Sequence, residues 1–411
     1  MDYYAAIWEQ AAGPAQVARI RETSEEFQHE VVDRSVQGYR LKRMSGYALA
    51  NSAHYAGIWE AEADSLTGTY CEDQRCFDLR RFADHMEASL AGRVVKYGFE
   101  VRRGRSVIQR AGGPKRTAAD PPASSFTAFD RFNPASVSKV VTAVATLQLL
   151  TKRGISLNAA VSPYLPPDWR IPANNRTITF REVLRHFSGL KDSLAGDYEY
   201  DDVRRVMETP IVMEDKAERD YQNVNYALLR VLAASLDGYS DWANNPGANT
   251  AARFISYVNK RIFSPIGIQD VEYRPEANGT FFYPFPAGSS HGTAYGDWSL
   301  KPGSAGSHLS AHELALFMAA LFKGMLLSPT MLAELWDGSG LTEDGFGELP
   351  DDRICRGKGG KFPGERNGGA DLKSALFHCS NGVSGMLLIN GTVAPGETIM
   401  DALNAAFSPA P

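Results

Sequence analysis

Residues 133–150 read Asn-Pro-Ala-Ser-Val-Ser-Lys-Val-Val-Thr-Ala-Val-Ala-Thr-Leu-Gln-Leu-Leu, and this stretch decides the fold. Its second half is apolar at helical spacing, at Val140, Val141, Val144, Leu147 and Leu150. Because residues three and four apart share one face of a helix, the pattern predicts a buried helix over 136–152. Pro134 breaks regular structure before this helix, and Gly154 ends it.

The same stretch contains an S-x-x-K motif, Ser136 to Lys139. A serine in the first turn of a helix lies at the positive end of the helix dipole, and a lysine three residues later shares its face. A partly desolvated lysine can activate such a hydroxyl as a nucleophile. The plain alternative is a helix-capping serine with an exposed lysine. A second copy, Ser188 to Lys191, lies in a Gly-containing turn, so we favour the first.

Two further segments are candidates for the same site. Tyr221-Gln-Asn223 precedes a predicted helix; the tyrosine can relay a proton, and the asparagine can hold a substrate carbonyl. His378-Cys-Ser380-Asn381-Gly382 joins two predicted strands, and a strand edge there can supply an oxyanion N–H together with that of Ser136. The alternative for His378 is a buried or edge-strand histidine without a catalytic role.

The predicted elements surround these motifs. We expect a helix over 77–90, strands over 94–102 and 106–111, two late strands over 374–379 and 384–390, and a helix over 396–407. A polar, Pro-rich loop follows over 112–125, helices and Pro/Gly-rich loops fill 155–350, and the Gly-rich segment over 357–369 is interpreted as a loop. Strands at both ends with helices between them predict an α+β fold with an antiparallel sheet.

A short repeat opens the chain. Tyr4-Ala-Ala-Ile-Trp-Glu9 recurs as Tyr55-Ala-Gly-Ile-Trp-Glu60, with an amphipathic stretch over 25–36 between the copies. One and a half units are too few for a solenoid, so we predict a small αβ module whose aromatic residues form its core. The chain then divides into this module, 1–75, and a catalytic domain, 76–411.

Composition and cysteine usage narrow the class. The net charge is −5, so the chain has no overall positive field that would attract nucleic acid. It contains no apolar run long enough to predict a membrane span. Residues 1–10 lack signal-peptide features, which fits either a cytosolic protein or a chain whose leader has been removed. Four cysteines allow three disulfide connectivities. We favour Cys71 with Cys76 and Cys355 with Cys379 over four separate thiols, which indicates an oxidising compartment.

The motifs together resemble the superfamily of class C β-lactamases, D-Ala-D-Ala carboxypeptidases and related esterases. The resemblance covers about 80–400 and rests on six segments, namely 135–139, 154–166, 179–190, 221–229, 303–315 and 381–385. It implies a transpeptidase-like fold: a sheet backed by helices plus a helical subdomain, with the site between them. It also implies Ser136 as nucleophile, Lys139 as its activating partner, Tyr221 as proton relay and Asn223 as substrate-amide contact.

The amino-terminal repeat resembles the module of the polyglycine hydrolases, secreted fungal endopeptidases that cut glycine-rich linkers in plant chitinases. The superfamily pattern also has Lys or His, then a small residue, then Gly; here His378 is followed by Cys379-Ser380, and the glycine comes at Gly382.

We therefore expect a secreted, monomeric serine peptidase acting through an acyl-enzyme on glycine-rich peptides, without metal or cofactor. An esterase or β-lactamase/carboxypeptidase is the second hypothesis, and a non-catalytic binding protein of the same fold is the third.

Overall fold

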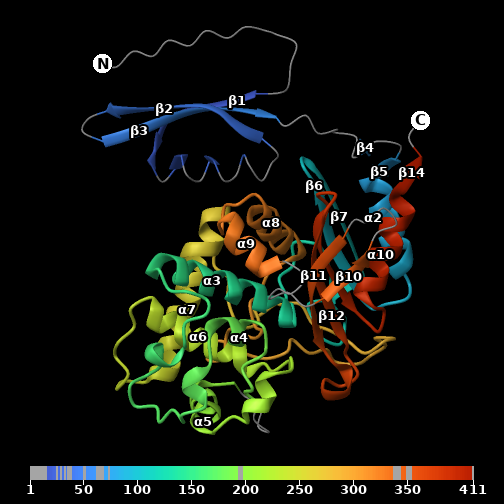
Figure 1. The fold of residues 1–411 in the computed structure, drawn as a ribbon. Coiled ribbons are helices and arrows are strands. Elements are labelled where there is room, and N and C mark those ends of the chain that lie inside the picture. The colour runs from blue at the N-terminus through green and yellow to red at the C-terminus, as the bar shows by residue number, and fades with distance from the viewer. Residues whose placement is uncertain are drawn as a thin grey trace.

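An antiparallel sheet of six strands, in the order β10-β11-β12-β13-β6-β7, forms the centre of the chain (Figure 1). The computed structural model describes residues 16–24, 26–27, 30–31, 34, 39–49, 52–61, 69–72, 75–192, 198–336, 344–348 and 354–409. The strands of this sheet are β6 (Lys96–Arg103), β7 (Ser106–Gly112), β10 (Asp344–Glu348), β11 (Ile354–Phe362), β12 (Leu372–Cys379) and β13 (Ser384–Asn390).

Helices cover both faces of the sheet. They are α2 (Leu79–Leu90), α3 (Ser138–Arg153), α4 (Phe180–Leu184), α5 (Tyr200–Glu208), α6 (Val224–Leu236), α7 (Pro246–Val258), α8 (Ala311–Phe322), α9 (Pro329–Trp336) and α10 (Pro395–Ala406). On one face α2 and α10 bury Phe82, Met86 and Leu403 against the strands. On the other face α8 packs against β6, β12 and β13, and the remaining helices gather beyond it (Figure 1).

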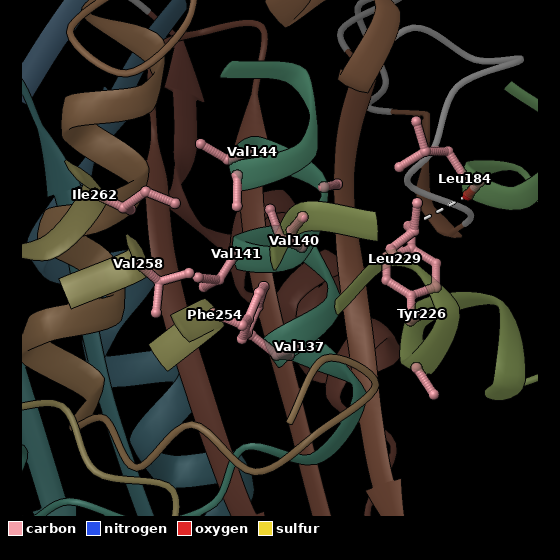
Figure 2. Packing of buried hydrophobic residues seen from close by; sticks show 14 of the residues in the cluster. Val137, Val140, Val141, Val144, Leu184, Tyr226, Leu229, Phe254, Val258 and Ile262 are labelled. Carbon is pink, nitrogen blue, oxygen red and sulfur yellow. Dashed lines mark hydrogen bonds between the residues drawn. The ribbon is translucent and has the colours of Figure 1, made fainter. Parts of the chain in front are cut away.

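Helix α3 lies at the centre of the helical part. Figure 2 shows Val141 of α3, and Val137 just before it, near Phe254 and Val258 of α7, with Leu229 of α6 nearby. A three-residue 3-10 turn, Ala135–Val137, leads into α3, and Gly154 ends it in the left-handed conformation with φ 63°. Twelve of its sixteen residues are buried, so the helix is a rigid support for the residues at its start.

The amino-terminal sheet has the order β1-β3-β2, from β1 (Gln16–Thr23), β2 (Tyr39–Leu49) and β3 (Ser52–Ala61). Trp59 is fully buried and its ring packs on Phe27, so the second copy of the repeat supplies core residues. The first copy, Tyr4 to Glu9, lies outside the described residues. The division of the chain at 75/76 stays a prediction; it falls within a paired hairpin, β4 (Thr69–Glu72) and β5 (Arg75–Asp78).

The two ends of the larger body meet in a small sheet, because β14 (Phe407–Pro409) pairs with β5. Phe77 therefore belongs to a strand, and the predicted helix over 77–90 begins two residues later. Its cap is Asp78, whose carboxylate accepts the N–H groups of Arg80 and Arg81.

Two segments differ from the sequence-based interpretation. The loop over 112–125 contains two short strands, β8 (Pro114–Arg116) and β9 (Ser124–Ser125). More importantly, the Gly-rich residues 357–362 belong to strand β11 instead of to the predicted loop. Glycine disfavours strands on propensity, but here the pairing partner β12 and the close approach of other backbone override that preference.

A disulfide joins β11 to β12 through Cys355 and Cys379, which confirms that predicted pair. Cys71 and Cys76 lie directly opposite each other in the β4–β5 hairpin, and Cys76 is disulfide-bonded. The side chain of Cys71 lies outside the described residues, so its pairing stays a prediction.

Candidate active site

Four predicted residues converge at the start of α3. Nζ of Lys139 donates hydrogen bonds to Oγ of Ser136 at 3.0 Å and to Oδ1 of Asn223 at 2.7 Å. Oη of Tyr221 donates to Oγ of Ser136 at 2.9 Å. A single hydroxyl therefore contacts both an ammonium group and a phenol, which is the arrangement that a general base and a nucleophile need.

The backbone before Ser136 is held from two sides. Oδ1 of Asn133 accepts the N–H groups of Ala135 and Gly306, each at 3.1 Å, and Oγ of Ser374 donates to the carbonyl of Pro134 at 2.7 Å. Ala135 has a φ of 52°, a conformation that a residue with a Cβ rarely adopts. The contacts around this turn fix that strained conformation, and with it the position of the hydroxyl.

Lys139 is fully enclosed. Its ammonium also donates to the carbonyl of Ser304 at 2.8 Å, and the side chain is 1% exposed. Burial lowers the pKa of Lys139; the charge of Lys358 lowers it too, while Tyr221 and Asp192 oppose the shift. The lysine is thus closer to losing its proton than an exposed lysine.

Tyr221 is flanked by two cations and packs against a neutral ring. Burial raises its pKa, but the charges of Lys139 and Lys358 outweigh burial and lower the pKa of Tyr221 to about 8. The two ammonium nitrogens lie 5.0 and 4.7 Å from the centre of its ring. The His186 ring lies 4.5 Å away; burial and the same lysine charges lower the pKa of His186 to about 2, so it stays neutral.

Asn223 is oriented by a carboxylate. Its Nδ2 lies 3.5 Å from Oδ2 of Asp192 and 3.3 Å from Oη of Tyr198, and Oδ1 of Asp192 accepts the N–H of Val224 at 2.8 Å. With the amide nitrogen on that side, the amide oxygen faces Lys139. Asp192 was not among the residues identified from the sequence.

Strand β11 passes directly in front of Ser136. A Cβ on Gly360 would lie 2.3 Å from the carbonyl oxygen of Pro134 and 3.1 Å from the backbone nitrogen of Ser136, so only glycine fits. Lys358, two residues earlier on the same face of the strand, reaches the Tyr221 ring. Beyond Gly357, the described residues place no strand on the side of β11 that faces away from β12.

A cavity of about 480 Å³ opens at this point. Its lining residues come from the start of α3, the loop before α6, the strands β11 and β12, and the start of α10: Ser136, Tyr221, Asn223, Lys358, Gly359, Gly360, Lys361, Lys373, Ser374, Ala375, Pro395 and Gly396. Three of the four residues predicted from the first two motifs line it, and Lys139 lies just behind them. Within the described chain, no group of His, Cys, Asp and Glu side chains could hold a metal ion.

The third predicted segment lies elsewhere. His378 stacks on Phe322 of α8 with ring centres 3.5 Å apart, and burial lowers its pKa to about 4. It is four residues along β12 from Ser374, which corresponds to about 13 Å of strand. Ser380, Asn381 and Gly382 form the tight turn from β12 to β13, where Asn381 accepts the N–H of Val383 and Gly382 has a φ of 82°. None of the four lines the cavity.

Lys358-Gly359-Gly360, and not His378 with the turn that follows it, lines the cavity beside Ser136. The signal was in the sequence: a lysine, a small residue and a glycine, in that order, followed within twenty residues by a strand-like segment. The glycines around this motif favour a loop on propensity alone, so the motif does not stand out as part of a strand.

The second S-x-x-K copy makes no such site. Oγ of Ser188 is buried against Oδ1 of Asn225 at 2.6 Å, whereas Lys191 is exposed and forms ion pairs with Asp220 and Asp215. The serine and the lysine of this copy thus have separate structural roles.

The chain belongs to the β-lactamase family: the β-lactamase family model matches residues 86–394. Residues 13–62 match a second model, described as a polyglycine hydrolase-like structural repeat. Both resemblances drawn from the sequence, and the predicted fold class, are confirmed.

Curated relatives cover only parts of the chain. "Putative penicillin-binding protein PbpX" of Bacillus subtilis is 26% identical over 220 residues, which is 52% of this chain and 51% of the relative. The D-alanyl-D-alanine-carboxypeptidase/endopeptidase AmpH of Escherichia coli K12 is 26% identical over 147 residues, 34% of this chain and 36% of AmpH. The match thus spans about half the length of these relatives or less.

Solved structures share the fold. A D-stereospecific amidohydrolase from Streptomyces sp. has a TM-score of 0.59 at 19% identity, covering 79% of this chain and 98% of its own. The D-amino acid amidase from Ochrobactrum anthropi SV3 has a TM-score of 0.60 at 16% identity, with the same coverage. FmtA from Staphylococcus aureus has a TM-score of 0.59 at 15% identity, covering 80% of this chain and 89% of FmtA.

Proposed function

We propose that this protein is a serine hydrolase in which Ser136 forms an acyl-enzyme. The observation that carries the proposal is the convergence of Lys139 Nζ and Tyr221 Oη on Ser136 Oγ, at 3.0 and 2.9 Å, in the wall of an open cavity. The backbone before the serine is strained and held in place, as is common at catalytic sites.

The chemistry proceeds in two halves. The Ser136 oxygen attacks the substrate carbonyl while its proton passes to the ionised Tyr221 oxygen along the 2.9 Å contact, with neutral Lys139 as the other acceptor within reach. The proton then goes to the leaving amine or alcohol as its bond to the acyl carbon breaks. Water repeats the sequence on the acyl-serine, releases the acid and restores the hydroxyl.

The oxyanion needs two N–H donors near the carbonyl. The N–H of Ser136 is one candidate, because it lies at the positive end of α3. The second is an N–H of β11 beyond Gly357, on the side where the described residues place no further strand. This assignment replaces the turn at 380–382.

For the substrate we propose an amide in an extended, glycine-rich peptide. The match of residues 13–62 to the polyglycine hydrolase-like repeat supports this choice. The glycines of β11 leave a flat strand beside the nucleophile, against which a peptide without bulky side chains can lie closely. A disulfide between β11 and β12 fits an extracellular setting, which we propose for the protein.

Three alternative functions differ in how well the observations support them. A carboxypeptidase acting on D-alanyl peptides is the second candidate, favoured by the names of AmpH and of the amidase structures. An esterase or β-lactamase uses the same acyl-serine. The hypothesis of a non-catalytic binding protein rested on the irregular motif at His378 to Gly382. It loses that support because Lys358 and Gly360 line the cavity beside Ser136.

A fluorophosphonate probe followed by mass spectrometry tests the proposal. We expect covalent labelling on Ser136, loss of labelling in Ser136→Ala, and full labelling in Ser188→Ala, the matched change in the second motif copy. Thermal unfolding checks that both variants are folded. Labelling that persists in Ser136→Ala would overturn the assignment.

A further inference from the structure

Two lysines face each other at the far side of the cavity. Lys361 of β11 is directly opposite Lys373 of β12 in the strand register, and both line the cavity that Ser136 lines. Together with Lys358 they are the charged residues of its lining, and no described acidic residue lines it. The local charge is thus strongly positive in a chain whose net charge is −5.

This placement costs stability. Like charges directly opposite each other on neighbouring strands are destabilising. Neither lysine forms an ion pair with a described residue, although Nζ of Lys373 donates to the carbonyl of Thr392. Burial lowers the pKa of Lys373 and the charge of Lys361 lowers it further, whereas Asp371 and Glu397 raise it; the net downward shift therefore comes from burial, because the carboxylates offset the charge of Lys361.

The lysine pair is continuous with the catalytic residues. Because side chains alternate along a strand, Lys358 and Gly360 lie on the face toward Ser136, and Lys361 lies on the opposite face. Gly359 and Gly360 present no side chain between the two faces, and no described strand pairs with the edge of β11 beyond Gly357, so the lining of one cavity includes residues from both faces of the strand. Pro395 and Gly396, at the start of α10, close this second lobe.

We propose that Lys361 and Lys373 form a subsite for a carboxylate of the peptide substrate, separate from the catalytic residues and from Lys358. The inference rests on the proposed function. Two ammonium groups facing one cavity match the two oxygens of a carboxylate, and binding relieves their mutual repulsion. The carboxylate is either the free C-terminus of the peptide or the side chain of an Asp or Glu within it.

Three glycine-rich peptides of equal length distinguish these sources: one neutral with an amidated end, one with a free C-terminus, and one with an internal Asp and an amidated end. Binding to Ser136→Ala protein is measured by fluorescence anisotropy, so that turnover plays no part. We expect one carboxylate peptide to bind about tenfold more tightly than the neutral peptide, the factor expected for one charge-assisted hydrogen bond. The preference should weaken at high salt.

Matched variants locate the effect. In K361Q/K373Q the preference should disappear, in K361R/K373R it should remain, and K152Q, which removes an exposed lysine outside the cavity, should change nothing. K152Q should also label with the fluorophosphonate at the normal rate, and the melting temperature of K361Q/K373Q checks that the doubly substituted protein is folded.

Equal affinity for the three peptides, no binding of any, or a preference that survives K361Q/K373Q would each overturn the subsite. These outcomes are distinct from failure of the proposed function, which shows as unlabelled Ser136 in the otherwise unchanged protein.

Discussion

The acidity of the Tyr221 phenol depends on the side chains around it. Two lysine charges outweigh burial and bring its pKa down to about 8, while neutral His186 supports its ring. None of these neighbours is adjacent to Tyr221 in the sequence. The sequence motif predicts Tyr221 as a site residue. Its lowered pKa follows only from the tertiary contacts with these neighbours.

The pH profile of acylation reports that acidity. Because a base acts in its deprotonated form, the rate of Ser136 labelling should rise with pH through about 8 and level off above it. In Tyr221→Phe the rate should fall by about 10²-fold or more, within the range for general-base catalysis, and this rise should vanish.

Tyr226→Phe is the matched control. Tyr226 also packs on His186, but its hydroxyl donates to the carbonyl of Leu184 (Figure 2), so the rise with pH should remain. An unchanged rise in Tyr221→Phe would contradict the assignment and identify Lys139 as the titrating group.

Strand β11 is the element that completes the site. It supplies Lys358, brings its backbone to the nucleophile and borders both lobes of the cavity. Its strand character is hard to predict from the sequence, because three of the six residues from 355 to 360 are glycine, which has a low propensity for strands.

Gly360→Ala tests this close approach. A methyl group would have to lie 2.3 Å from the Pro134 carbonyl, which is backbone and cannot rotate away, so β11 and the start of α3 must separate. We expect a folded protein whose Ser136 labels about 10²-fold more slowly, the size of effect that a displacement of about 1 Å at a catalytic site produces.

Gly46→Ala in β2 is the control, because a Cβ there meets only ordinary contacts of 3.5 Å or more. Labelling should proceed at the normal rate in this variant. If Gly360→Ala labelled equally fast, the proposed role of β11 beside the nucleophile would be wrong.

At the scale of the whole molecule, the central sheet unites segments from both ends of the chain. Strands β6 and β7 come from the beginning of the body and β10 to β13 from its end, while the helices between them form the other half of the site. No helix of the described part of the chain is long and apolar enough to cross a membrane.

The buried disulfide stabilises this arrangement. It closes a segment with a sequence separation of 24 and joins β11 to β12 three residues from Lys358. Replacing Cys355 and Cys379 by Ala should lower the free energy of unfolding by roughly 3 kcal/mol, the usual value for a loop of this size. Urea denaturation measures the change; stability equal to that of the unchanged protein would contradict it.

The sequence by itself determined the family, the helix that carries Ser136 and Lys139, the pairing of Tyr221 with Asn223, and the antiparallel sheet. These follow from local signals: apolar spacing along one helix face, and residue types three or fewer positions apart. Only the tertiary structure decided that Lys358, Gly360 and Asp192 complete the site and that His378 to Gly382 do not. Their positions depend on which strand lies beside α3, and that is set by long-range packing and pairing, on which spacing along the chain carries no information.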